Sequence, residues 1–386
     1  MRVLHIVPGR LFGGVENTLI TVVRFRHCCP EMHTEVAVCL PGRLSDELGA
    51  LGVSVHKLGL VRARYPHTVW RGRRRLRALL RRNPFDIVIC HMPWALAMFG
   101  PVVQSEGIPL AFGAHGPWEG NHWIERWAVR VRPDIAICVS HFLARDISKP
   151  YPYVPAEVIY NPSPPVRRLS EAERQAVRAQ AGTAKDAVVI AQVSRMQPGK
   201  GHGVCLEALA KLRNLENWEC WQIGGPQTPA EVEYLRDLRE RAASLSIAGR
   251  VRFWGMRADI ARLLAAADIY CQPNDTFLEG LGNTFVEALR VGLPVITTRI
   301  GAAPEVVDDT CGILLPRADI PATAGALEKL ILDPDLRGRL GAAGPPRASL
   351  LFAPETQIPR LRDVLTRAVE RSRNPNEVSY RQSASL

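Results

Sequence analysis

The chain has 386 residues, is 47% hydrophobic and 23% charged, and carries a formal net charge of +11. Its length and composition indicate a globular protein of two domains, and because no apolar run reaches roughly 18 residues, they exclude a membrane-spanning helix. The excess of positive charge is compatible with nucleotides, acidic lipids or nucleic acid as partners and does not distinguish among them.

Nine cysteines are scattered along the chain without a C-x-x-C pair. This spacing predicts neither a metal site nor a disulfide framework, and we expect reduced thiols in a cytoplasmic protein. The strand-like run Arg2–Val7 begins at once, so we expect no signal peptide.

The first half of the chain alternates short apolar runs with amphipathic segments. Strands are expected at residues 3–7, 36–40, 53–58, 86–90, 110–114, 135–139 and 158–160, with helices between most of them. Such alternation predicts a parallel sheet with helices on both faces.

Two features of this half lie at the carboxyl edge of the predicted sheet. The loop Pro8–Gly14 lacks the G-x-G-x-x-G order, but Gly13-Gly14 let the backbone approach a ligand at the start of a helix expected at residues 15–26. His115 directly follows the strand 110–114, where ligands bind in open α/β folds. A plain tight turn and a structural histidine are the alternatives, and both stay open.

Nine arginines crowd the segment Arg62–Arg82, whose apolar positions fall on one face of a helix with Trp70 beside it. An ordinary solvated basic face is one interpretation. The other is a surface for an anionic partner, either membrane headgroups or a charged acceptor.

The proline-rich stretch Asn161–Pro165 is expected to be the linker between two domains. After it the opening of strand, loop and helix repeats, with a strand at 188–193 and a helix to about residue 212. Further strands are expected at residues 221–223, 251–254, 268–272 and 293–297. The two halves therefore begin alike, as two doubly wound domains do.

Arg195 and Lys200 flank a Pro-Gly turn at the start of the second half's first helix. The stretch does not satisfy the Walker A pattern, because Ser194 and Gly201 stand where that motif needs Gly and Ser or Thr. Two cations in this position suit a diphosphate, and exposed loop cations are the alternative.

The stretch from Glu279 to Glu287 places two carboxylates around two glycines and a helix start. Thr284 and Glu287 have capping-box spacing, which puts Glu287 in the first helical turn and Glu279 in the preceding loop. A helix N-terminus favours an anion, and carboxylates accept hydrogen bonds from sugar hydroxyls. In the alternative interpretation Glu287 only caps the helix and Glu279 is solvated.

Several loops together resemble one family in order, the family 4 glycosyltransferases of the GT-B fold. Gly13-Gly14 and His115-Gly116 are similar to its N-terminal motifs. The others are Arg195 with Pro198-Gly199-Lys200-Gly201, Gly224-Gly225-Pro226, Glu279-x7-Glu287, and Gly292-x-Pro294-Val295 with Gly301 and Pro304-Glu305. The resemblance covers the chain to about residue 345.

The resemblance implies an α/β protein of two doubly wound Rossmann-like domains that face a central cleft. The implied domains are 1–163 on the acceptor side, 164–354 for the nucleotide sugar, a helix 355–372 that crosses back to the first domain, and a polar tail at 373–386. The family often has Asn-Gly-x-Asp where this chain has Asn161-Pro162-Ser163-Pro164, and this departure affects the hinge rather than the donor site.

The resemblance also implies a role for each site residue. Glu279 would hold the transferred sugar, and His115 would contact that sugar or steady its leaving group. Arg195 and Lys200 would bind the donor diphosphate, and Glu287 the ribose hydroxyls. The remaining donor contacts would come from Gly14, Gly280, Leu281, Gly282, Asn283, Thr284, Met256 and Arg257.

The implied reaction is sugar transfer with retention of anomeric configuration from a nucleotide-diphosphate sugar to a glycan or lipid-linked acceptor. No metal and no cofactor are expected, a UDP-sugar is slightly favoured as donor, and nucleic acid is not expected as a partner. Fixed cations and a helix N-terminus stabilise the charge that develops on a departing diphosphate. The implied location is cytoplasmic, at the inner face of the membrane if Arg62–Arg82 bind it.

Two other functions stay open. A nucleotide-sugar epimerase or hydrolase of the same fold would release free sugar or change the donor without an acceptor. A non-catalytic basic binding protein would keep its biological activity after Glu279→Ala, although the intact donor motifs speak against it.

Overall fold

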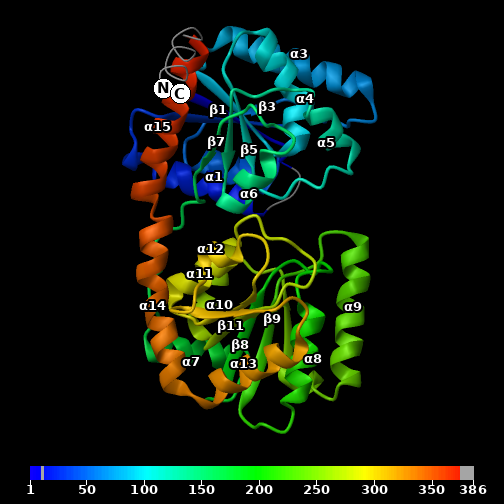
Figure 1. Ribbon diagram of the computed structural model, residues 1–386, viewed down its shortest axis with the longest axis vertical. Helices are drawn as coiled ribbons and strands as arrows, with labels where there is room; N and C mark the ends of the chain where they lie inside the picture. The colour runs from blue at the N-terminus through cyan, green and yellow to red at the C-terminus, as the bar shows by residue number, and fades with distance from the viewer. Residues whose placement is uncertain (10–12, 374–386) are drawn as a thin grey trace, which may run out of the picture. The chain divides into compact units, whose positions relative to one another are not determined.

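A computed structural model describes residues 1–9 and 13–373 of the chain (Figure 1). The chain forms two compact units. Unit 1 is Met1–Pro164 with the segment that begins at Phe352, and unit 2 is Pro165–Leu351. The expected linker at Asn161–Pro165 contains the first of these two division points. Of the polar tail expected at 373–386, only Arg373 is among the described residues.

Unit 1 contains a seven-stranded parallel sheet with the order β3-β2-β1-β4-β5-β6-β7. Its strands are β1 (Arg2–Val7), β2 (His33–Val38), β3 (Val55–Lys57), β4 (Ile87–His91), β5 (Leu110–Ala114), β6 (Ile135–Cys138) and β7 (Ala156–Val158). β4 and β5 are buried along their whole length, because parallel strands covered by helices on both faces need continuous apolar runs. The order reverses between β1 and β4, which places a ligand crevice at their carboxyl ends.

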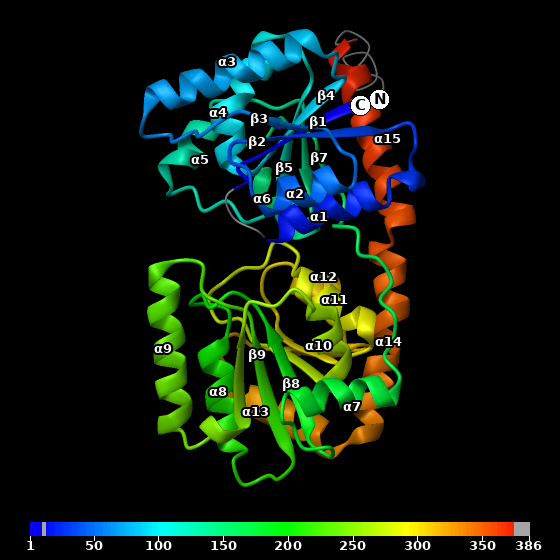
Figure 2. The same ribbon diagram turned by 180° about the vertical axis from the view of Figure 1, so that it is seen from behind.

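The helices of unit 1 form two layers (Figures 1 and 2). The helices α1 (Gly14–Arg24), α2 (Arg43–Ala50) and α15 (Pro354–Arg373) lie on one face of the sheet. The helices α3 (Pro66–Arg82), α4 (Met92–Ser105) and α5 (Trp123–Ala128) pack against one another on the other face. The short α6 (His141–Ile147) contacts β6 and β7.

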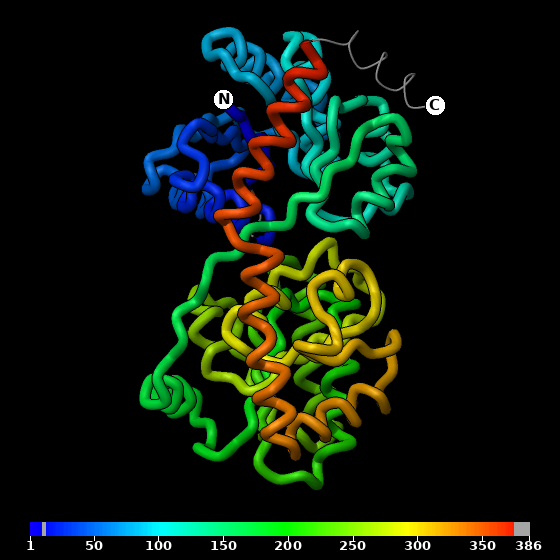
Figure 3. Tube along the Cα trace, turned by 60° about the vertical axis from the view of Figure 1, so that its left-hand side comes forward, coloured from blue at the N-terminus to red at the C-terminus, as the bar shows by residue number. Residues whose placement is uncertain are grey.

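The last helix is part of the core of unit 1, and Figure 3 traces it in red. Ile358, Val364 and Leu365 of α15 are buried in one cluster with Val3 of β1 and Ile137 of β6. This helix therefore covers the sheet as an integral layer, although it is far from the strands in the sequence. Pro359 lies within its second turn, where the missing N–H removes one backbone bond.

Unit 2 contains a six-stranded parallel sheet with the order β10-β9-β8-β11-β12-β13. Its strands are β8 (Val188–Val193), β9 (Trp218–Ile223), β10 (Val251–Gly255), β11 (Ile269–Gln272), β12 (Val295–Thr298) and β13 (Gly312–Leu315). The order reverses between β8 and β11, so the loops after these two strands meet at one crevice.

Helices cover both faces of this second sheet. The helices α8 (His202–Lys211), α9 (Pro229–Ser244) and α13 (Ile320–Leu332) pack on one face. The helices α7 (Glu171–Gln180), α10 (Ile260–Ala266), α11 (Asn283–Val291) and α12 (Ala303–Val306) pack on the other, and α14 (Pro334–Phe352) follows α13 in the chain.

Several expected elements need correction. The strand expected at 36–40 lies at His33–Val38, and the strand expected at 221–223 begins three residues earlier, at Trp218. The strand expected at 158–160 lies at Ala156–Val158, two residues earlier. The strand β13 was missed, because Gly312–Leu315 is only four residues long, although the polar turn at 308–310 precedes it. Helix α14 continues through Pro345 and Pro346, which the sequence rules treat as helix breakers.

Candidate active site

The crevice of unit 2 is centred on an ion pair between Lys200 and Glu279. Lys200 Nζ lies 2.6 Å from Glu279 Oε1, and each side chain is only 13% exposed. Two amides donate to the same oxygen, Gln272 at 3.0 Å and Asn274 at 3.4 Å. Among the described residues, the second carboxylate oxygen, Oε2, has no such partner. The pair therefore leaves an acceptor available to a ligand.

The environment of the Lys200 ammonium is unusual for a lysine. The Phe277 ring centroid lies 3.4 Å from its Nζ. Burial lowers the pKa of Lys200, the Glu279 carboxylate opposes that shift, and the nearby Arg195 guanidinium adds to it. A buried cation in this position is stabilised when an anion enters the crevice.

A tight turn brings Lys200 to Glu279. Gly201 has φ +78°, and a Cβ there would lie 2.1 Å from the carbonyl oxygen of Pro273. The amides of Asp275 and Phe277 both donate to Gly199 O at 3.1 Å. Only glycine fits such a left-handed position against a neighbouring backbone, so the loop after β8 is fixed on the loop after β11.

Arg195 occupies the same loop but has different partners. Its guanidinium lies 3.0 Å from the carboxylate of Glu231, which is nearly buried at the start of α9, and donates to Gln197 at 2.8 Å. Since both cations are held by protein carboxylates, an incoming diphosphate would compete with Glu231 and Glu279 for them.

A buried polar network supports this loop from below. The His202 ring contacts Ser194 Oγ at 2.9 Å and Gln222 Oε1 at 2.7 Å. Gln192 Nε2 donates to the carbonyl of Lys200 at 2.8 Å. Sequence reasoning missed these residues together with Gln272 and Asn274, although polar residues at the ends of apolar strands were a visible signal.

The capping box expected at Thr284 and Glu287 is wrong. Helix α11 begins at Asn283, and its N-cap is Gly282 with φ +88° and no side-chain cap. A Cβ at Gly282 would meet the Phe285 ring at 2.4 Å, so no residue with a side chain fits there. Thr284 Oγ1 instead accepts a hydrogen bond from the Tyr270 hydroxyl at 2.9 Å. The N-terminus of the helix is therefore without the side-chain partner that the pattern predicted.

Glu287 is the fifth residue of α11 rather than part of its first turn. Its side chain is half-buried, and burial raises its pKa to about 7. In the described part of the chain, no hydrogen bond or ion pair reaches its carboxylate. Both Glu279 and Glu287 lie close enough to Tyr270 to raise the pKa of its hydroxyl, with burial as the larger cause.

Met256 and Arg257 lie just after β10, at the same edge of the sheet. Met256 is 70% exposed. Arg257 is paired with Asp259 at 2.8 Å and lies over the Trp254 ring at 5.3 Å. In the sheet order β10 is separated from β8 by β9, so these two residues are further along the edge than Lys200.

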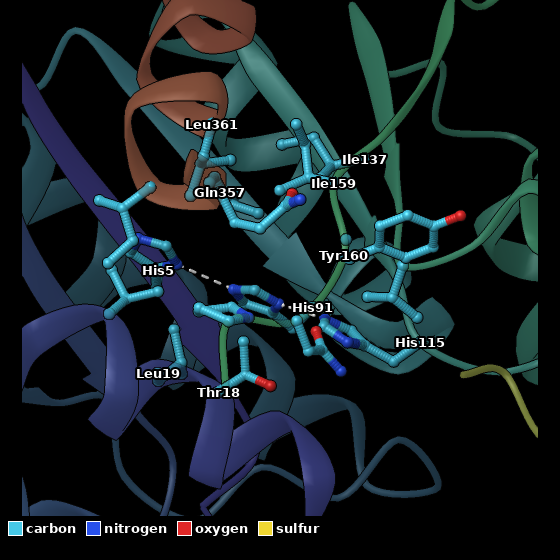
Figure 4. Close-up of a pocket in the computed structure, with 17 residues that line it drawn as sticks. His5, Thr18, Leu19, His91, His115, Ile137, Ile159, Tyr160, Gln357 and Leu361 are labelled. Carbon is cyan, nitrogen blue, oxygen red and sulfur yellow. Dashed lines mark hydrogen bonds between the residues drawn. The ribbon is translucent and has the colours of Figure 1, made fainter. Parts of the chain in front are cut away.

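In unit 1, His115 follows β5 as expected and is joined to two histidines that the sequence reasoning missed (Figure 4). Its Nε2 lies 2.8 Å from His91 Nδ1, and His91 Nε2 lies 2.9 Å from His5 Nδ1. Burial lowers the pKa of His115 to about 4. Gly14 is the first residue of α1, and residues 10–12 of the expected glycine-bearing loop lie outside the described residues.

Family models match most of the chain. Residues 12–165 match the model described as Glycosyltransferase Family 4, and residues 173–347 match the one described as Glycosyl transferases group 1. The chain belongs to the family 4 glycosyltransferases. Its two Rossmann-like units are those of the GT-B fold.

Individual relatives of this chain are named for different substrates. A D-inositol 3-phosphate glycosyltransferase of Saccharomonospora viridis is 32% identical over 66% of this chain and 64% of its own. A GDP-mannose-dependent alpha-(1-6)-phosphatidylinositol monomannoside mannosyltransferase of Mycolicibacterium smegmatis is 33% identical over 41% of this chain and 42% of its own. The chain thus spans less than two thirds of the length of either curated relative.

A solved structure has the same fold as this chain at low sequence identity. The crystal structure of Anabaena Alr3699/HepE in complex with UDP and glucose superposes with a TM-score of 0.83 at 22% identity. The match covers 95% of this chain and 99% of that one.

The described residues offer neither a cluster of metal ligands nor a membrane-spanning helix. Among residues 1–9 and 13–373, no three His, Cys, Asp or Glu side chains are grouped so that they could hold a metal ion. Within the same residues, every helix is too short or too polar to cross a bilayer.

Helix α3 presents the basic surface expected from the sequence. Arg73, Arg75, Arg77 and Arg81 donate hydrogen bonds to backbone carbonyls or to Glu106. Six exposed arginines have no carboxylate partner among the described residues: Arg62, Arg64, Arg71, Arg74, Arg75 and Arg82. Trp70 is 60% exposed on the same helix, with Arg74 over its ring at 5.7 Å.

Proposed function

We propose that this protein is a retaining glycosyltransferase that moves a sugar from a nucleoside-diphosphate sugar to a glycan or lipid-linked acceptor. The observation that carries the proposal is the buried pair of Lys200 and Glu279 beside the N-terminus of α11. A cation, a helix N-terminus and a carboxylate with a spare oxygen suit a ligand that has a diphosphate next to sugar hydroxyls.

Each donor group has a proposed partner. Lys200 and Arg195 bind the diphosphate, and the backbone of residues 280–284 contacts phosphate and sugar. Glu279 accepts hydrogen bonds from the transferred sugar through its unpaired oxygen. Glu287 accepts from the ribose hydroxyls, since its half-buried carboxylate lacks a partner within the described residues. Met256 and Arg257 lie near the base, and Gly14 approaches the phosphates.

The proposed reaction breaks the bond between the anomeric carbon and the diphosphate oxygen and forms one to the acceptor oxygen. The bonding pair goes to the diphosphate, where fixed cations stabilise it, and the acceptor proton follows onto a phosphate oxygen. In this proposal Glu279 positions the sugar and is not a nucleophile, because its ion pair with Lys200 and two amide hydrogen bonds lower the nucleophilicity of the carboxylate. The acceptor then attacks from the leaving group's face, which retains configuration.

The identity of donor and acceptor is inferred from the relatives. The Anabaena structure was solved with UDP and glucose, which supports a uridine donor. The Mycolicibacterium relative is named for a phosphatidylinositol monomannoside, which supports an acceptor at a lipid surface. We therefore also propose that the exposed arginines of α3 contact anionic headgroups at the cytoplasmic face of a membrane.

A panel of nucleotide sugars tests this function. The nucleotide sugar that the protein uses as donor should raise the melting temperature of the protein, because it binds only the native state. With an acceptor present, the product should keep the anomeric configuration of the donor when examined by NMR. An inverted product would contradict the proposed mechanism, and release of free sugar alone would indicate a hydrolase.

A further inference from the structure

Three histidines form one continuous chain across three neighbouring strands of unit 1 (Figure 4). His5 of β1 stands opposite Ile89 of β4, two residues before His91. His91 stands opposite Gly113 of β5, two residues before His115. Because side chains two residues apart share one face of a strand, the register places all three rings on the face that α1 and α15 cover.

Gly113 makes the second contact of this chain possible. A Cβ at this position would lie 2.7 Å from His91 Nδ1 and 3.3 Å from His115 Nε2. Any side chain there would enter the space in which the two rings meet. Glycine at position 113 therefore provides the space in which the rings of His91 and His115 meet.

All three imidazoles are neutral at pH 7. Burial lowers the pKa of His5 and of His115 to about 4 and that of His91 well below its usual value. Repulsion from His115 lowers the pKa of His5 and His91 further, and His5 adds to the effect on His91. A neutral imidazole carries one N–H, so each ring can donate through one nitrogen only.

These two contacts couple the three tautomers. His5 Nδ1 faces His91 Nε2 at 2.9 Å, and His91 Nδ1 faces His115 Nε2 at 2.8 Å. Each contact needs one hydrogen, so either all three rings carry it on Nδ1 or all three carry it on Nε2. Any mixture would leave two lone pairs or two N–H groups facing each other.

The two ends of the chain differ in what they can bind. Neither His5 Nε2 nor His115 Nδ1 has a hydrogen-bond partner among the described residues. His5 is 2% exposed and lies among apolar side chains, so an N–H on its Nε2 would be a buried donor without a partner. His115 Nδ1 is also buried, but the His115 side chain is only partly buried at the carboxyl end of β5, so a substrate that binds there can bring an oxygen to this nitrogen. The Nδ1–H form is therefore the one that substrate binding satisfies.

We propose that His5 and His91 are positioning residues that hold His115 as a neutral Nδ1–H donor to a substrate oxygen. This rests on the proposed function, in which His115 contacts the transferred sugar or its leaving group. His5 and His91 act only through His115 and touch no substrate.

The first test is independent of substrate turnover. In the full-length protein with ¹⁵N-labelled histidine at neutral pH, nitrogen NMR shifts report the tautomer of each ring, and single His→Phe variants assign the signals. We expect His5, His91 and His115 to share one tautomer. This should be the Nδ1–H form once a nucleotide sugar is bound. Mixed tautomers, a charged ring, or Nε2–H in the complex would overturn the proposal.

The second test breaks the row of histidines with two variants, of which the first keeps every histidine. Gly113→Ala should separate His91 from His115, release His115 into a mixture of tautomers, and lower kcat about tenfold with little change in the donor KM. His91→Phe should do the same while preserving ring volume. Gly49→Ala is the matched control, because a Cβ there meets no atom within 4 Å. An unchanged His115 tautomer in both variants would show that the chain does not set it.

The two tests separate this inference from the proposed function. If the protein transfers no sugar but the three rings share a tautomer, the coupling of the three histidines is supported and the glycosyltransferase proposal fails. If the protein transfers sugar and Gly113→Ala keeps the wild-type kcat, the glycosyltransferase proposal stands and the positioning role fails.

Discussion

The two units have related sheets but opposite chemistry at their crevices. In unit 2 the crevice between β8 and β11 holds charges, with Lys200 paired to Glu279 and Arg195 paired to Glu231. In unit 1 the edge formed by β1, β4 and β5 holds three neutral imidazoles bonded only to one another among the described residues. One edge suits an anion, and the other suits a neutral polar group. The difference shows that a shared fold fixes where a ligand binds, while a few side chains decide which ligand charge the site accepts.

The largest effect is expected at Lys200, in the charged crevice of unit 2. We expect Lys200→Ala to weaken donor binding by about 2–4 kcal/mol, because a charge-assisted contact in a closed site is lost. Lys211→Ala, an exposed lysine at the end of α8, is the control. Calorimetric titration with the nucleotide measures both variants. Donor affinity like that of the wild type in Lys200→Ala would refute the assignment.

Glu279→Gln removes the other half of the pair and should act on the free protein. The Gln keeps the shape of the side chain but leaves the buried ammonium without its carboxylate, at a cost of about 3 kcal/mol in the free energy of unfolding. A bound diphosphate should restore part of this loss by supplying the missing charge. Equal destabilisation with and without nucleotide would show that the anion binds elsewhere.

The basic surface of α3 should contribute a salt-sensitive effect outside both crevices. Arg71→Gln together with Arg74→Gln should weaken binding to anionic liposomes by about 1 kcal/mol per residue at low ionic strength. Lys211→Gln with Arg213→Gln in unit 2 is the control for charge alone. A cosedimentation assay that shows no liposome binding by the wild type would make α3 an ordinary solvated face.

The smallest expected effect is a loss of stability with rising pH that comes from Glu287 in the charged crevice. The pKa of Glu287 is raised from 4.5 to about 7, so the native state binds more protons than the unfolded state between these values. Its contribution to stability is therefore lost as the pH rises through that window, by about 1 kcal/mol for a half-buried group. The lowered pKa values of the three histidines act in the opposite direction, and they are common to both proteins in the test.

Comparison of wild type with Glu287→Gln isolates this contribution. The difference in unfolding free energy between the two proteins, measured by denaturant titration, should change from about pH 5 to about pH 7.5 in favour of the variant. A difference that stays constant over this range would contradict the raised pKa of Glu287.

The sequence was informative wherever one short pattern has one physical solution. Apolar runs bounded by polar loops predicted most strands, since parallel strands buried on both faces need such runs. Gly199-Lys200-Gly201 marked the turn after β8, because its glycines meet another backbone closely. The two cations of that loop are present in the crevice. Glu231, which pairs with Arg195, and Gln272, whose amide donates to Glu279, come from distant elements and had no local signal.

Other features depend on tertiary contacts that no local pattern specifies. Thr284 has the spacing of a capping residue, yet its hydroxyl binds Tyr270, since that hydroxyl is buried and needs a partner. His5 and His91 each appeared to be ordinary residues of apolar strands. Only the order β1-β4-β5 and the register at Gly113 bring them into line with His115.

The most direct test of the central claim is a crystal structure with a bound nucleoside diphosphate. The account predicts a diphosphate within hydrogen-bond distance of Lys200 and Arg195 at the N-terminus of α11, with the ribose hydroxyls on Glu287. A nucleotide bound elsewhere, with the Lys200–Glu279 pair untouched, would contradict it.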